Sequence, residues 1–452
     1  MNPARLRETG RFQHLPSRDA DTAEPASTQE LLGILDPGSR YAKPLRPCGA
    51  RSAATDCHTS SMGTTISTSK LNRIVNIDHS AMTVTANSGV RLDTLNRILA
   101  EDGLELVGSH EVVGRTLGGA VSSPCFGPSI GDSGAYLSSH VASLKLALSN
   151  GRLLNVTPEQ KNLLGAVRMS YGLLGVVVEA TLRIRPATVF HADHRRVTID
   201  DFANATGALA DSAVGLQFYL MPHKDRAYLD IRRFSSKDSK GIKALWAVKD
   251  WGESTVLPRV CSSLHKVVPI RGMRFGLIDS ISAAAHDIVN TRFVKNGSNA
   301  TSESGKYRAI GPGKIRFSTW CFPATDFGVV LPAYRDFCRQ TYEEHGYRCD
   351  LPAMGYRVAK DSSALLSPSF DETMIALQTM STQEKGWENF VIDLAEFAEH
   401  WGGTPMFNLT RSASVDHARQ VYGARRDMFN KIRRQLDPDN RLLNPFLAQY
   451  FL

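Results

Sequence analysis

The stretch RTLGGAVSSPCFGPS, residues 115–129, is the part of the sequence that decides the fold. Small residues dominate it, so its main chain can come close to a large flat ligand and offer backbone amides to the ligand's acceptors. Two more stretches follow, VASLKLALSNG at 141–151 and SYGLLGVVVE at 170–179. Together the three stretches predict a nucleotide cofactor held mainly by backbone atoms.

Length and composition indicate an ordinary soluble enzyme. A chain of 452 residues exceeds one typical core, which predicts about two or three domains. Hydrophobic residues make up 42% and charged residues 22%, and no apolar run approaches the ~18 residues that a membrane span needs. The first ten residues lack the apolar core of a secretory signal, and the seven cysteines show neither CxxC pairs nor zinc-ligand spacing. We therefore expect a cytoplasmic protein with reduced thiols and no metal site.

The basic excess points to acidic small molecules and not to nucleic acid. The formal net charge is +8, which is modest for this length. The densest basic pairs, Arg425–Arg426 and Arg433–Arg434, are spaced as on a solvated helix face. No basic stripe is interleaved with aromatic residues for base stacking. An acidic cofactor or substrate accounts for the sign of the charge.

Local patterns predict α+β architecture along the chain. A helix should begin after Ser27 or Thr28, with Glu30 where a capping box places its acid. Asn150–Gly151 is a hairpin turn between two apolar segments, and residues 414–436 have helical spacing. From about residue 187 the pattern changes to one typical of an antiparallel sheet with helices.

Several motifs occur in a fixed order and carry a family resemblance. They are residues 25–30, RPCGARS at 46–52, the glycine run at 115–129, YGLLG at 171–175, His400–Trp401 and DPDNRLLNPF at 437–446. In this order they resemble the vanillyl-alcohol-oxidase-type FAD flavoproteins. Within that group the chain is most similar to the sugar-1,4-lactone oxidases, the gulonolactone and arabinonolactone oxidases. The similarity covers nearly the whole chain.

The resemblance implies both a fold and a domain order. Residues 1–187 would form a two-part, PCMH-type FAD-binding domain. Residues 188–413 would form an α+β cap domain with a large antiparallel sheet over the flavin ring. Residues 414–452 would return to close the cofactor site.

The same resemblance assigns the FAD-binding residues. A tight turn whose successive N–H groups point one way suits a pyrophosphate, although on its own it could also be an ordinary surface turn. The residues expected to contact FAD lie in that turn, in the glycine run and beside the third stretch: Cys48, Gly49, Ala50, Arg51, Ser52, Thr116, Gly118, Gly119, Ser122, Gly172, Gly175 and Val176.

One departure from the family pattern concerns FAD attachment. Many of these oxidases attach FAD covalently through a histidine just before the serine of the first loop, and Arg51 stands there. Arginine cannot form that bond. His58 and His110 are out of register, so we predict non-covalent FAD.

Two further departures concern the substrate side. The family carries a glutamate and an arginine two residues apart in a cap strand; in this chain Gly355 replaces the acid and Arg357 remains. Gly403 stands where the family motif often has a lysine near the flavin. Arg357, His400 and Trp401 are therefore the candidate catalytic residues, each with an ordinary packing role as the alternative.

The resulting functional hypothesis is FAD-dependent oxidation of the CH–OH group of a sugar lactone or related polyol, by hydride transfer to flavin N5, with oxygen or another acceptor. One alternative is a non-catalytic or sensory FAD-binding protein. Another is an FAD-dependent sugar dehydrogenase or reductase that uses NADPH, although no GxGxxG motif supports a nicotinamide site. The resemblance allows membrane association, but no apolar span supports it.

Overall fold

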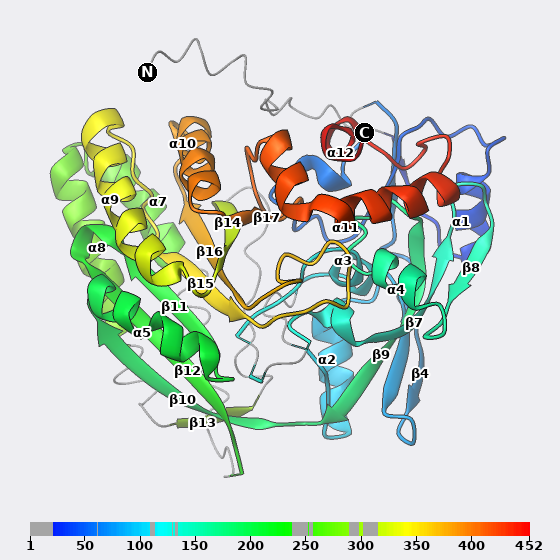
Figure 1. Cartoon of the computed structure of the whole chain (residues 1–452), viewed down its shortest axis with the longest axis horizontal. Coiled ribbons are helices and arrows are strands. Elements are labelled where there is room, and N and C mark those ends of the chain that lie inside the picture. Colours follow the sequence, from blue (N-terminus) through cyan, green and yellow to red (C-terminus); the bar gives the residue numbers. More distant parts are fainter. Residues whose placement is uncertain are drawn as a thin grey trace.

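The computed structural model describes residues 21–60, 62–108, 114–128, 130–131, 134–236, 252, 256–288, 298–301 and 315–452. Three sheets organise this part of the chain. Figure 1 shows the largest sheet with its helices on one side of the molecule and the two smaller sheets on the other. Among the described residues no helix is long and apolar enough to cross a bilayer. The mixed architecture confirms the predicted α+β class.

The N-terminal part is a small parallel sheet. Its strands β1 (Asp21–Ala23), β2 (Leu45–Cys48) and β3 (Thr64–Ser67) pair in the order β1-β3-β2. Helix α1 (Thr28–Leu35) connects the first two strands. The Glu30 amide donates to Ser27 Oγ, and the Ala26 amide donates to Glu30 Oε2, so the predicted cap is confirmed.

A second sheet completes the FAD-binding half. Six strands take part: β4 (Ile74–Asp78), β5 (Thr83–Asn87), β6 (Leu104–Leu106), β7 (Val141–Ala147), β8 (Leu153–Val156) and β9 (Val176–Pro186). Strands β7 and β8 form the hairpin predicted at Asn150–Gly151. The helices of this part are α2 (Leu92–Glu101), α3 (Leu117–Ser122), α4 (Lys161–Val167) and two short 3-10 turns, η2 (Asp56–His58) and η3 (Leu137–His140).

An eight-stranded sheet forms the other half, and all its strand pairs are antiparallel. In chain order its strands are β10 (Val189–Val197), β11 (Gly215–Met221), β12 (Arg226–Ser235), β13 (Ser298–Thr301), β14 (Arg316–Pro323), β15 (Ala353–Val358), β16 (Met374–Ser381) and β17 (Thr404–Pro405). This sheet confirms the large antiparallel cap expected from the resemblance.

The two faces of this sheet have different neighbours because side chains alternate along each strand. On the face we call the helix face, Phe218 packs with the core residues of α5 (Ile199–Asp211), α9 (Phe327–His345) and α10 (Trp387–His400). On the face we call the inner face, Tyr219 packs toward α7 (Leu257–Val267) and α8 (Arg271–Ile288). The inner face also meets the FAD-binding half, since Tyr136 shares a cluster with Val358 and Ala376. The 3-10 turn η4 (Pro222–Lys224) joins β11 to β12.

The C-terminal segment returns to the FAD-binding half. Helices α11 (Val415–Leu436) and α12 (Pro445–Phe451) cross above the two smaller sheets in Figure 1. Their side chains Tyr422, Phe429 and Phe451 belong to the same hydrophobic core as Leu117 and Leu144. This packing makes α11 and α12 part of the core of the FAD-binding half.

Candidate functional site

A cleft lies within the FAD-binding half, and its empty space, open solvent at its mouth included, is about 750 Å³. It is lined by the loop after β2, by η2, by α3 and by the loop that precedes β9. Every predicted FAD-binding residue lines it. These twelve residues are Cys48, Gly49, Ala50, Arg51, Ser52, Thr116, Gly118, Gly119, Ser122, Gly172, Gly175 and Val176.

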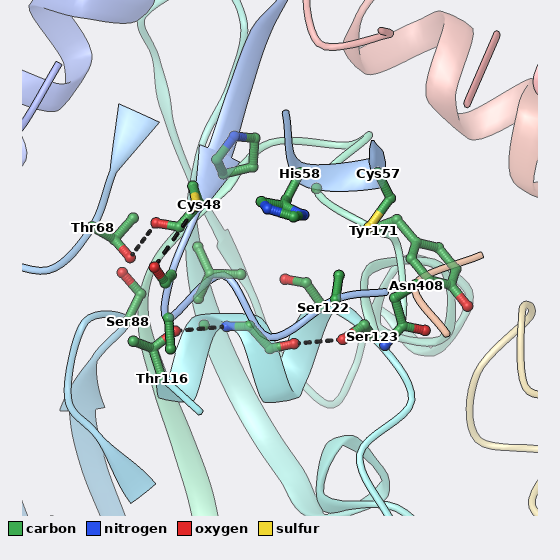
Figure 2. Close-up of a pocket in the computed structure, with 18 of the residues that line it drawn as sticks. Cys48, Cys57, His58, Thr68, Ser88, Thr116, Ser122, Ser123, Tyr171 and Asn408 are labelled. Atoms are coloured by element: carbon green, nitrogen blue, oxygen red, sulfur yellow. Dashed lines mark hydrogen bonds between the residues drawn. The ribbon is translucent and has the colours of Figure 1, made fainter. Parts of the chain in front are cut away.

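The loop after β2 closes against the start of α3. Arg51 adopts a left-handed backbone conformation with φ of 54°, and such a turn lets successive N–H groups point to one side. A Cβ atom on Gly49 would lie 2.0 Å from Oγ1 of Thr116, so no larger residue fits there. The hydroxyl of Thr116 in turn accepts a hydrogen bond from the Gly119 amide at the start of the helix (Figure 2). The two glycine-bearing loops therefore depend on each other.

Two more glycines at the walls of the cleft have no room for a side chain. Gly172 has φ of 70°, and a Cβ there would lie 2.5 Å from Cγ of Pro47. A Cβ on Gly118 would lie 2.7 Å from Cβ of Ser88. Close backbone approach thus brings the three glycine-bearing segments together around one space.

The cleft carries positive charge. Arg46, Arg51 and Arg115 line it, and no Asp or Glu occurs among its described lining residues. Arg46 is buried and donates to the carbonyls of Leu442, Tyr171 and Cys57. Burial lowers the pKa of Arg46 to about 10, so it stays charged at neutral pH. This charge favours a ligand with a diphosphate.

The remaining polar groups of the cleft are neutral and incompletely paired. Burial lowers the pKa of His58 to about 4 and raises the pKa of Cys57 to about 11. His58 Nδ1, Ser88 Oγ and Asn408 Oδ1 are buried and have no hydrogen-bond partner within the described part of the chain. Figure 2 shows these three side chains around the cleft. A glycine cradle, three arginines and unpaired polar atoms fit FAD. The other histidine considered for FAD attachment, His110, lies outside the described residues.

The comparisons with known proteins agree with this geometry. A family model described as "FAD binding domain" matches residues 21–157, and a model described as "D-arabinono-1,4-lactone oxidase" matches residues 180–450, more than half of the chain. The chain belongs to the D-arabinono-1,4-lactone oxidase family. It is an FAD-linked oxidoreductase, as the resemblance implied.

Curated relatives span almost the full length. The L-gulono-1,4-lactone dehydrogenase of Mycobacterium tuberculosis (strain ATCC 25618 / H37Rv) is 23% identical over 432 residues, which cover 93% of this chain and 94% of the relative. The L-gulonolactone oxidase of Scyliorhinus torazame is 22% identical and covers 95% and 94%. The cholesterol oxidase of B. sterolicum has a TM-score of 0.73 at 13% identity, covering 95% of this chain and 94% of that one, and therefore shares the fold.

Sequence reasoning missed several residues of the cleft. Arg46 begins the same motif as Cys48, and Arg115 begins the glycine run, so both were within the stretches already singled out. Ser88 and Asn408 stand outside those stretches and carried no signal. Asn408 reaches the cleft because the chain after β17 crosses back to the FAD-binding half.

The structure does not bring Arg357 to the cleft. It lies on the helix face of the large sheet, is 1% exposed, and donates to the carbonyls of Ala210 and Gly131 at 2.7 and 3.2 Å. These contacts hold the end of α5 and the loop at residues 130–131. In this position Arg357 bonds to carbonyls on the helix face, and its assignment as a catalytic residue stays a prediction.

Gly355 lies on the same face, because it pairs with Phe218 in the strand register. A Cβ there would lie 2.2 Å from Cζ of Phe218 and 2.6 Å from the carbonyl of Ala376, so the glutamate of the family pattern has no room. The inner face instead presents Met354 and Tyr356. These residues therefore occupy the two positions that an acid–arginine pair would need to face the FAD-binding half.

His400 and Trp401 also lie away from the cleft. His400 ends α10 and is exposed, while Trp401 packs beside Phe397 on the helix face. Gly403 has no room for a lysine, because a Cβ would lie 2.8 Å from the carbonyl of Ala398. The segment that follows this motif carries Asn408 into the cleft.

Proposed function

We propose that the chain oxidises the CH–OH group of a sugar lactone or related polyol, with FAD as its cofactor and with oxygen or another electron acceptor. Membership of the lactone oxidase family and the names of its relatives support this substrate class. The observation that carries the proposal is the cleft itself: three separate glycine-bearing segments meet around one space that holds arginines and, among the described residues, no acid.

The chain's own residues have distinct roles in this proposal. Arg46, Arg51 and Arg115 would offset the charge of the diphosphate, and the glycines would let main-chain amides reach it. When bound, FAD accepts a hydride at N5 from the substrate carbon. Because Arg51 precedes Ser52 at the position of the linking histidine, we propose that FAD is held without a covalent bond.

Substrate contacts would come from the inner face of the large sheet. Tyr356 lies there opposite Gln217 in the strand register, and its ring contacts Phe126 with centroids 6.1 Å apart. Phe126 follows Ser122 and Ser123 of the cleft by only a few residues. This contact connects the sheet to the cofactor cleft, so we propose that Tyr356 contacts the substrate.

A flavin spectrum and anaerobic reduction test the class of activity. The purified protein should show the visible absorbance of oxidised FAD, and that absorbance should bleach when a lactone or polyol substrate is added without oxygen. Absence of flavin after gentle purification and FAD supplementation would overturn the proposal. Failure of every lactone and polyol to bleach a bound flavin would favour the second candidate, a non-catalytic FAD-binding protein, which the glycines at 355 and 403 support.

The attachment of FAD and the cellular location of the protein can be tested separately. Acid precipitation should leave the yellow colour in the supernatant, and colour in the pellet would show a covalent bond. All seven cysteines are unpaired, which supports a proposed reducing, cytoplasmic environment. Mass spectrometry of the protein from its native source should then find seven free thiols.

A further inference from the structure

Asn408 is a polar side chain that the large-sheet half contributes to the cofactor cleft. Of the described residues that line the cleft, all but Asn408 lie between Arg46 and Val177. Asn408 stands in the segment that leaves the large sheet after β17. It is 3% exposed, and its Oδ1 is buried with no hydrogen-bond partner in the part of the chain that the structure describes. Because an unpaired buried oxygen costs free energy, this oxygen indicates a donor that a ligand supplies.

The main chain around Asn408 is fixed against the FAD-binding half. The amide of Ala54 donates to the carbonyl of Asn408 at 2.8 Å, and the hydroxyl of Thr55 donates to the carbonyl of Phe407. The ring of Phe407 packs on the ring of Tyr171, with centroids 5.3 Å apart. Asn408 is therefore held at the cleft before a ligand arrives, and a group placed in advance loses less conformational entropy on binding.

The position of Asn408 indicates which part of FAD it meets. Figure 2 shows Asn408 and Ser123 on one side of the cleft and Ser88 on the other. From Ser123 the chain continues to Phe126, whose ring contacts Tyr356 on the inner face of the large sheet. The flavin ring has to reach the substrate, which the proposed function places at this sheet. The ring therefore belongs on the Asn408 side, and this step of the inference rests on the proposed function.

The chemistry of a side-chain amide matches one edge of the flavin ring. That edge is an imide, in which the N3–H donor lies between the two acceptors C2=O and C4=O. An asparagine side chain carries a carbonyl acceptor and N–H donors, so it can form two hydrogen bonds with such an edge at once, as it does with the edge of adenine. An ionised diphosphate offers acceptors only, so it would leave Oδ1 of Asn408 unpaired.

We propose that Asn408 recognises the imide edge of the flavin, with Oδ1 accepting from N3–H and Nδ2 donating to a neighbouring ring carbonyl. These two hydrogen bonds orient the ring within the cleft. They also make the binding of the flavin part of FAD depend on a residue from the large-sheet half, whereas the glycine loops and arginines that hold the diphosphate all belong to the FAD-binding half.

Titration calorimetry of the FAD-free full-length chain with three ligands tests the proposal. The ligands are FAD, FAD methylated at N3, and ADP, which lacks the flavin. In the unmodified chain, methylation at N3 should weaken binding about tenfold, because a buried acceptor loses its donor. Asn408→Leu should weaken FAD binding about tenfold, change ADP binding less than about twofold, and bind FAD and the methylated form equally. Asn408→Asp retains the acceptor, so it should retain the preference for FAD over the methylated form.

Asn76→Leu makes the same change at an exposed position of β4 and should leave all three affinities unchanged. Equal binding of FAD and its methylated form by the unmodified chain would overturn the proposal without any variant. So would an Asn408→Leu protein that binds FAD as the unmodified chain does, or that still prefers FAD over the methylated form. Equal losses of FAD and ADP binding in Asn408→Leu would assign Asn408 to packing instead. Failure of the unmodified chain to bind FAD would contradict the cofactor itself.

Discussion

The cofactor cleft and the inner face of the large sheet differ in how closely they follow the family. In the cleft, all twelve residues expected from the family pattern lie around one space. On the large sheet, the expected acid is a glycine with no room for a side chain, and the expected arginine faces the helices. The cleft is built by main chain that approaches closely, whereas the sheet face depends on which side chains point inward.

This difference has a simple geometric cause. In a strand, a shift of one residue moves every side chain to the opposite face. Residues 354 and 356 point to the inner face, and residues 355 and 357 point to the helix face. The face on which a strand motif places its side chains therefore depends on a match correct to the residue, whereas a glycine turn keeps its shape.

The largest expected effect comes from restoring the family's acid. Gly355→Glu should lower the free energy of unfolding by about 4 kcal/mol or more, because its side chain would meet Phe218 and the Ala376 carbonyl. Chemical denaturation measures the change. Gly207→Glu, on an exposed helix position with no atom near its Cβ, should leave the free energy of unfolding unchanged or raise it by up to about 1 kcal/mol, because glutamate favours a helix more than glycine does. A folded Gly355→Glu protein of unchanged stability would show that residue 355 does not point to the helix face.

The second largest expected effect is on FAD affinity, and it tests the cofactor cleft. Gly49→Ala should weaken FAD binding about a hundredfold, because the new methyl would displace Thr116 and with it the start of α3. Titration of the FAD-free protein with FAD, followed by flavin fluorescence, measures the affinity. Gly33→Ala in α1, where nothing lies near the Cβ, should leave the affinity unchanged. Equal affinities of the two variants would contradict the proposed placement of FAD.

A third pair of variants compares neighbouring residues on opposite faces. Arg357→Met should destabilise the protein by about 3 kcal/mol, because two carbonyls lose their donor, and should leave kcat/KM per bound flavin unchanged. Tyr356→Phe should keep stability within about 1 kcal/mol and lower kcat/KM about tenfold. Denaturation and steady-state kinetics with a substrate that bleaches the flavin measure both. A lower kcat/KM in Arg357→Met together with an unchanged kcat/KM in Tyr356→Phe would show that Arg357, and not Tyr356, contacts the substrate.

The sequence predicted most of the fold and a set of residues that all line one cleft, for identifiable reasons. The Ser27 cap, the Asn150–Gly151 hairpin and the glycine loops depend on local backbone preferences that a short stretch encodes. Asn408 depends on how the chain crosses between two domains, which no local pattern encodes. The turn between α7 and α8 carries no motif, and only the exposure of Val267 and Ile270 in the structure shows that these apolar residues face outward.

The smallest expected effect is a pH dependence that originates in the cleft. Burial lowers the pKa of His58 to about 4 in the folded chain, whereas the unfolded value is near 6.5. The unfolded chain therefore binds a proton first, so stability is complete above about pH 6.5 and falls by about 2 kcal/mol as the pH drops to about 5. Denaturation of the FAD-free protein at several pH values measures this slope.

Two histidine variants show which side chain causes the change of stability with pH. His58→Asn should remove only part of this loss of stability at low pH. Burial and nearby arginines also lower the pKa of His223, to about 3, so His223 contributes to the loss of stability in the same direction. His79→Asn, at an exposed side chain, should leave the slope unchanged. If His58→Asn had the same slope as the unmodified chain, the imidazole would be protonated or hydrogen-bonded within the cleft, and its unpaired Nδ1 would no longer mark a place for the cofactor.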